Sequence, residues 1–143
     1  YNIGPFYVNE HIKIQNTLVN QKKSEFDHSS AYGWRENIMI ELICDHQIQD
    51  VPKNSNSSGI HHIAWIAPDF EKEREILKKE GCEEVLFANV GHRNGMKFAW
   101  FYPGDEINHF YEIYEKSDDI DSFYKFLYEQ SKGWNGENPI RSV

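Results

Sequence analysis

The sequence predicts an α+β fold in which short strands outnumber helices and one order of elements recurs. Three observations lead to this prediction. β-branched and aromatic residues gather in short runs bounded by Gly, Pro, Asn and Asp, which is typical of strands. Two segments place apolar residues at helical spacing. The second half of the chain is predicted as strand–helix–strand–strand–strand, and the first half as strand–strand–strand, the same unit without its first strand and helix.

Length and composition limit the class of protein. With 143 residues, 15% aromatic and 27% charged, the chain is expected to fold as one domain. The net charge of −8 argues against nucleic acid as a partner. No apolar stretch approaches the roughly 18 residues needed to span a membrane, and no secretory leader is recognisable. Cys44 and Cys82 lack a C-x-x-C pattern, so we expect reduced thiols in a cytoplasmic protein, with a disulfide between them left open.

The first half, residues 1–50, is expected to hold three strands. Residues 6–19 favour an extended strand or hairpin arm, and the polar residues 20–30 favour a connection. Two adjacent strands follow, "SAYGWR" and "NIMIELICD". Residues 51–59, rich in Asn, Ser and Pro, predict a joint loop between two halves of a single domain over 1–143.

The second half, residues 60–116, opens with a strand at 60–67 and a helix. Pro68 and Asp69 are start signals for this helix and Gly81 is a stop signal. Its inner side is expected to carry Phe70, Ile76 and Leu77.

Three more strands and a second helix complete the chain. The strands are expected in "EEVLFANVG", "MKFAWFYP" and "INHFYEIYE". Residues 117–143 predict an amphipathic helix with Ser117 as its N-cap, followed by a loose tail from residue 135.

Alternation along "NIMIELIC" separates two faces of the strand. Ile38, Ile40, Leu42 and Cys44 share one face, which is wholly apolar and is expected to lie against a helix. Glu41 therefore points to the opposite side.

The same argument applies to "HHIAWIA" and "HFYEIYE". His62 shares a face with the small Ala64, opposite Trp65, Ile63 and His61. Glu112 alternates with apolar and aromatic neighbours on the last strand. Three strands can thus each present one ligand-type residue: Glu41, His62 and Glu112. A divalent metal satisfies two buried carboxylates and an imidazole together, and these ligands suit Zn, Mn, Ni, Co or Fe.

Taken singly, these residues also have ordinary structural interpretations. Glu41 can be a surface residue of an edge strand, and Glu112 one of several solvated acids in "YEIYEKSDD". His62 can be a core histidine with a hydrogen-bond partner. Three residues on strands far apart in sequence do not form a spacing signature.

Several segments resemble one family. "GIHHIAWIAPDFEKEREILKKEGCE" resembles the opening of the second module in the vicinal oxygen chelate superfamily, which contains glyoxalases, bleomycin-resistance proteins and dioxygenases. "NIMIELIC" resembles the closing strand of the first module, and "FAWFYPGDEINHFYEIYE" the last two strands of the second. "GPFYV" is similar to a segment of the methylmalonyl-CoA epimerase-like and lactoylglutathione lyase-like subgroup. The similarity covers roughly residues 3–116.

The resemblance implies a specific fold and site. It implies paired βαβββ modules that form a curved open mixed sheet, with the first module lacking its first strand and helix in this chain. Carried over residue by residue, it implies that Glu41, His62 and Glu112 are ligands of a divalent metal. The family's first ligand, a His or Gln, belongs to the strand that the first module lacks here.

The resemblance also implies a function. The chain is expected to be a metal-dependent isomerase, epimerase or lyase acting on a small metabolite with vicinal oxygens, through an enolate-type intermediate. Glu112 or Glu41 is then the candidate catalytic base as well as a ligand. Phe110, Tyr114 and Tyr102 are candidate pocket residues, and a homodimer is the expected assembly.

Two other hypotheses stay open at this point. In the first, the chain is a metal-free protein of the same fold that binds or sequesters a small molecule, with Trp34, Trp65 and Trp100 available to stack on a planar ligand. Core or interface packing is the alternative role of these tryptophans. In the second, the chain is a degenerate domain with neither activity.

Overall fold

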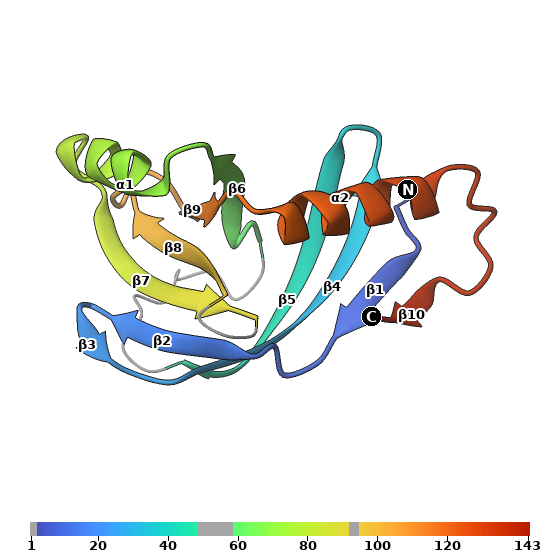
Figure 1. Ribbon diagram of the computed structural model, residues 1–143, viewed down its shortest axis with the longest axis horizontal. Coiled ribbons are helices and arrows are strands. Elements are labelled where there is room, and N and C mark those ends of the chain that lie inside the picture. The colour runs from blue at the N-terminus through green and yellow to red at the C-terminus, as the bar shows by residue number, and fades with distance from the viewer. Residues whose placement is uncertain (1–2, 49–58, 92–94) are drawn as a thin grey trace. The chain divides into compact units, whose positions relative to one another are not determined.

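The computed structural model describes residues 3–48, 59–91 and 95–143, and these residues form a mixed α+β structure of strands in two sheets with two helices (Figure 1). The α+β prediction is confirmed, with two hydrogen-bonded sheets in place of the one expected. The elements are β1 Phe6–Asn9, β2 Ile14–Val19, β3 Lys22–Lys23, β4 Phe26–Arg35, β5 Ile38–Ile48, β6 His62–Ala67, α1 Phe70–Lys79, β7 Glu83–Val90, β8 Met96–Tyr102, β9 Phe110–Glu115, α2 Asp118–Ser131 and β10 Ile140–Ser142. The predicted joint loop lies outside the described residues, apart from Gly59. Neither described helix is long and apolar enough to cross a membrane.

The chain divides into two compact units, each with one sheet. Unit 1 comprises Tyr1–Ile12, Asp27–His46 and Ser117–Val143, and unit 2 comprises Lys13–Phe26 and Gln47–Lys116. The sheet of unit 1 has the strand order β10-β1-β4-β5, and that of unit 2 has the order β3-β2-β7-β8-β9-β6. Each unit is described below by itself.

Unit 2 contains the element order expected for the second half of the chain. β6, α1, β7, β8 and β9 follow one another as strand–helix–strand–strand–strand. The first strand of this series, β6, pairs with the last, β9, in parallel, whereas β9, β8 and β7 are antiparallel neighbours. A parallel pair needs a crossover between its strands, and here α1, β7 and β8 supply it.

Helix α1 begins and ends where its sequence signals predict. The Asp69 carboxylate accepts a hydrogen bond from the Lys72 amide at 3.0 Å, which makes Asp69 the N-cap. Gly81 follows the C-terminal end with φ +92, a backbone conformation that favours glycine. Phe70 and Leu77 are buried, but Ile76 is partly exposed, since one residue along a helix turns the side chain about 100° away from its neighbour.

The two faces of the unit 2 sheet carry separate apolar clusters. On one face, Phe70 and Leu77 of α1 pack with Ala99, Phe101 and Ile113. The other face holds an aromatic cluster without α1, whose buried members are Val19, Phe26, Val85, Leu86, Ala88, Phe98, Trp100 and Phe110. A strand that is buried on both faces has a continuous apolar sequence, as "FAWF" of β8 does.

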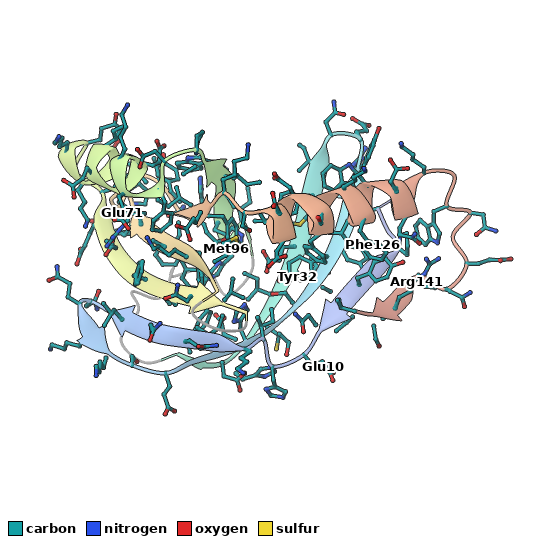
Figure 2. The ribbon with its side chains drawn as sticks, in the orientation of Figure 1. Glu10, Tyr32, Glu71, Met96, Phe126 and Arg141 are labelled. Carbon is teal, nitrogen blue, oxygen red and sulfur yellow. The ribbon has the colours of Figure 1, made fainter. Side chains whose placement is uncertain are left out.

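In unit 1, α2 packs on one face of its sheet through aromatic pairs. The Tyr7 ring lies 4.8 Å from that of Phe126, and the Tyr32 ring lies 5.1 Å from that of Phe123. Figure 2 shows Tyr32 and Phe126 between α2 and the strands below it. The Ser117 hydroxyl accepts from the Ile120 amide at 3.2 Å, so the predicted N-cap of this helix is confirmed.

Three of the strand predictions are wrong. Residues 6–19 form two strands, β1 and β2, which belong to different sheets and are separated by His11 with φ +50. Residues 26–30, expected in a connection, belong to β4. The tail expected to be loose forms β10, because β1 offers it an edge: the Phe6 amide donates to Pro139 O at 2.8 Å and the Val143 amide donates to Val8 O at 3.1 Å.

The apolar face of β5 does not lie against a helix. Ile38 is 63% exposed and Leu42 is 56% exposed. The Ser29 hydroxyl on β4 contacts His46 on β5, so Ile38 and Leu42, which alternate with His46 along β5, lie on the same face of the sheet as Ser29. Tyr32 and Trp34 project from the other face of β4, and their rings contact α2. Helix α2 therefore packs against the other face of this sheet.

We expect Asp69→Ala to lower the free energy of unfolding by about 0.5–2 kcal/mol, because the Lys72 amide loses its acceptor. Asp69→Asn is the matched control, since asparagine caps as well as aspartate. Urea denaturation followed by circular dichroism measures both. Equal losses in the two variants would contradict the assigned cap.

Two leucines give a second test of the packing. Leu77→Ala is expected to lower the free energy of unfolding by about 2–5 kcal/mol, because it leaves a cavity between α1 and the sheet. Leu42→Ala is expected to change stability by no more than about 0.5 kcal/mol, because the side chain already contacts solvent. The same denaturation measurement compares them, and a large loss in Leu42→Ala would show that something covers the β5 face.

Candidate metal centre

His62 and Glu112 meet on one face of the unit 2 sheet. In the parallel β6–β9 ladder, His62 is the partner of Phe110, and Ala64 is the partner of Glu112. The two side chains therefore project to the same side, two positions apart, and the small Ala64 lies between them. The His62 Nε2 atom lies 3.0 Å from Glu112 Oε2, and their side chains are only 9% and 3% exposed.

Aromatic rings surround the pair. Trp100 on β8 is the partner of Glu112, and its ring stacks on Phe110 with 5.8 Å between centroids and on His62 with 6.4 Å. A carboxylate in apolar surroundings is costly unless it is hydrogen-bonded or paired with a cation. A proton or a metal ion shared with His62 meets that requirement.

His61 extends the pair to a chain of three groups. Its Nδ1 lies 3.0 Å from Nδ1 of His62, so one of these two nitrogens carries a hydrogen and donates a hydrogen bond to the other. Strand alternation predicts His61 on the face of Ile63 and Trp65, and this prediction is wrong. Its ring lies 4.8 Å from Trp100 and 5.6 Å from Phe110, because His61 precedes the first residue of β6 and does not follow the alternation of that strand. The adjacent histidines are the only sequence signal for this contact.

The geometry of the pair suits a metal ion. Two ligand atoms about 2.1 Å from a metal and at right angles to each other are about 3.0 Å apart, which matches the separation of Nε2 and Oε2. The contact of His62 Nδ1 with His61 holds the ring in place, as the outer contacts of metal-bound histidines do. An imidazole nitrogen and a carboxylate oxygen are the donors that Zn, Mn, Ni, Co and Fe accept.

Glu41, the third predicted ligand, lies on β5 in unit 1. It is half-buried, and alternation places it on the face opposite Leu42 and Ile38. That face also carries the buried His28 and Ser30 of β4. Glu41 thus points away from the apolar face of β5, which was expected to lie against a helix and is exposed.

The candidate pocket residues share the face of His62 and Glu112. Phe110 is buried in the aromatic cluster, and the half-buried Tyr114 ring lies 6.2 Å from Phe98. Tyr102 packs its ring 6.5 Å from Phe110 and donates its hydroxyl proton to Asp105. This hydrogen bond raises the pKa of the Tyr102 phenol.

The three tryptophans considered for ligand stacking all pack within their own units. Trp34 lies against Tyr124 and Tyr128 of α2. Trp65 faces α1, as the alternation predicted, and its indole N–H donates to Glu73 at 3.0 Å. Trp100 is buried in the aromatic cluster. Packing therefore accounts for each of them.

No protein-family model matches this chain, and no curated protein matches it. The chemistry of the site therefore rests on the residues themselves.

We expect Glu112→Ala, measured in the presence of a chelator, to lower the free energy of unfolding by about 3–5 kcal/mol, because it leaves a buried imidazole without its partner. Glu112→Gln keeps a hydrogen-bond acceptor, so it is expected to lower the free energy of unfolding by less than Glu112→Ala. Glu106→Ala, at an exposed acid between β8 and β9, is the control. A cost for Glu112→Ala no larger than that of the control would show that the pair does not stabilise unit 2.

Proposed function

We propose that this protein is a metal-dependent isomerase, epimerase or lyase that acts on a small metabolite with vicinal oxygens. The observation that carries the proposal is the buried contact of His62 Nε2 with Glu112 Oε2. Glu112 is the only buried acid among the described residues, and it lies in an aromatic cluster next to an imidazole. Buried titratable groups that face each other in apolar surroundings are typical of functional sites.

Glu41 is proposed as the third ligand of the same metal ion. Glu41, His62 and Glu112 each offer one ligand atom, which makes one nitrogen and two oxygen donors. Two carboxylates balance the charge of a divalent ion, and the imidazole adds a neutral donor. The metal is one of Zn, Mn, Ni, Co or Fe.

The proposed chemistry is proton transfer at a carbon next to a carbonyl group. A bound divalent ion supplies Lewis-acid stabilisation of the oxyanion that this reaction creates. Glu112 or Glu41 removes the proton from carbon and returns it, as general base and general acid. His61 holds His62 through the contact between their Nδ1 atoms. The aromatic rings of Trp100 and Phe110 exclude water from the carboxylate of Glu112.

The order of strands in unit 2 supports the proposed fold. β6 pairs with β9, β9 with β8, and β8 with β7, so the first strand of the series joins the last. We propose that residues 62–115 form one βαβββ module of the vicinal oxygen chelate type. The expected homodimer and the cytoplasmic location remain predictions from the sequence.

Metal analysis is the first test. Protein purified without chelators is expected to hold one equivalent of a divalent transition metal that is lost in His62→Ala, Glu112→Ala and Glu41→Ala. His109→Ala is the matched control, since this histidine packs against Tyr111, whose side chain is on the other face of β9. A metal content that is the same in His62→Ala as in the control would refute the site.

Hydrogen exchange at carbon tests the reaction itself. In deuterated water, a panel of 2-methyl acyl thioesters and 2-hydroxy carbonyl compounds is expected to include one that gains deuterium next to its carbonyl group, with the exchange followed by NMR. The exchange is expected to fall at least about 100-fold in Glu112→Gln or in Glu41→Gln, whichever is the base. Undiminished exchange in both variants would exclude these carboxylates as the base.

A further inference from the structure

The indole N–H group of Trp100 has no hydrogen-bond acceptor among the residues that the structure describes. Trp100 is only 2% exposed, so solvent at the surface of the protein does not accept this hydrogen. Tryptophan N–H groups are normally hydrogen-bonded when buried, because a buried donor without an acceptor loses the hydrogen bond that it made to water. The N–H group of Trp100 therefore requires an explanation.

The other tryptophans of the chain show the usual arrangement. The sequence holds four tryptophans, and Trp100 is the most buried of them. Each of the other three donates its indole hydrogen to a glutamate near it in the sequence. The acceptors are the Glu36 carbonyl for Trp34 at 2.8 Å, the Glu73 carboxylate for Trp65 at 3.0 Å and the Glu137 carbonyl for Trp134 at 2.7 Å. The contrast indicates that a bound molecule accepts from Trp100.

Packing explains the position of the Trp100 ring but not its N–H group. The ring stacks on Phe110 and His62, on the face of the sheet opposite α1. A phenylalanine would fill an apolar cluster without a donor that needs an acceptor. The rings of Phe26 and His61 cross the indole at 75° and 71°, but the face of a ring is only a weak acceptor for an N–H group.

Strand register places this donor beside the proposed metal centre. Trp100 on β8 is the direct partner of Glu112 on β9, so the two side chains leave the sheet on the same side with Cβ atoms about 5 Å apart. The indole does not donate to the carboxylate of Glu112, although the two residues are neighbours. The N–H group is therefore available to a third group that lies next to Glu112.

The proposed reaction creates a group of that kind. Removal of a proton from the carbon next to a carbonyl moves negative charge onto the carbonyl oxygen, and a fixed N–H donor stabilises this charge. Glu112 as a carboxylate offers only lone pairs, so it cannot stabilise a negative oxygen by hydrogen bonding. The indole of Trp100 is a donor without a charge of its own, and the aromatic rings around it strengthen its hydrogen bonds by excluding water.

We propose that the indole N–H of Trp100 donates a hydrogen bond to the substrate oxygen on which negative charge develops. This assignment rests on the function proposed above and adds an oxyanion donor to it. It also restricts the substrate, whose reacting oxygen is unsubstituted and fits next to the flat face of the aromatic cluster. Trp100 is then a catalytic residue, while His61 acts on the centre through His62.

NMR of the indole groups tests the contact in the unaltered chain. The full chain is labelled with ¹⁵N in its tryptophans and loaded with Zn²⁺, which is diamagnetic, and the N–H signal of Trp100 is identified by its loss in Trp100→Phe. The probe is acetohydroxamate, an anion that chelates divalent metals through two neighbouring oxygens and resembles an enolate. We expect the Trp100 proton signal to move downfield at saturation and the signals of Trp34, Trp65 and Trp134 to stay in place.

Substitution of the tryptophan measures the strength of the contact. Trp100→Phe keeps an aromatic ring and removes the donor, so the affinity of the Zn²⁺-loaded protein for acetohydroxamate is expected to fall about 10–100-fold, as for the loss of a hydrogen bond to a charged group. Trp65→Phe is the matched control, because it removes an indole N–H on the face that packs against α1. Its affinity is expected to equal that of the wild type in calorimetric titration.

The outcomes separate this assignment from the function on which it rests. If the wild type does not hold Zn²⁺, or holds it and does not bind acetohydroxamate, the metal centre and the oxyanion donor are both refuted. If the probe binds while the Trp100 signal stays in place, or Trp100→Phe binds it as tightly as Trp65→Phe does, the donor role alone is refuted. A buried water molecule is then the acceptor of this N–H group.

Discussion

The arrangement of unit 2 depends on the burial of one carboxylate. Glu112 lies at the middle of β9 with β6 and β8 on either side, and its side chain is buried among aromatic rings. Such a group requires a cationic or hydrogen-bonding partner, and His62 provides one at 3.0 Å. Parallel pairing of β6 with β9 brings these residues to the same face. The crossover through α1, which makes the pairing parallel, therefore also brings the imidazole to the carboxylate.

The two faces of that sheet have different roles. Helix α1 covers one face with Phe70 and Leu77, and this packing contributes a dry apolar layer. The opposite face combines aromatic rings with the buried contact of His62 with Glu112. Helix α1 therefore stabilises the sheet from one side, and the polar pair that we propose as a metal centre lies on the other.

Unit 1 also has one packed and one exposed face of its sheet. Helix α2 covers Tyr7 and Tyr32, and β10 closes the β1 edge of the sheet. The face opposite α2 exposes Leu42 and carries the stacked rings of His11 and His46.

The sequence by itself determined what depends on neighbours along the chain. The caps Asp69 and Ser117 and the alternation that puts Trp65 opposite His62 follow from local rules, and all were predicted. Only the tertiary structure decided that β1 and β2 join different sheets, that the C-terminal residues form β10, and that the His61 ring turns toward Trp100. These features depend on which strand edges and which side of a sheet remain open after the other elements have packed. The periodicity of a single segment does not contain that information, because it reflects only neighbours along the chain.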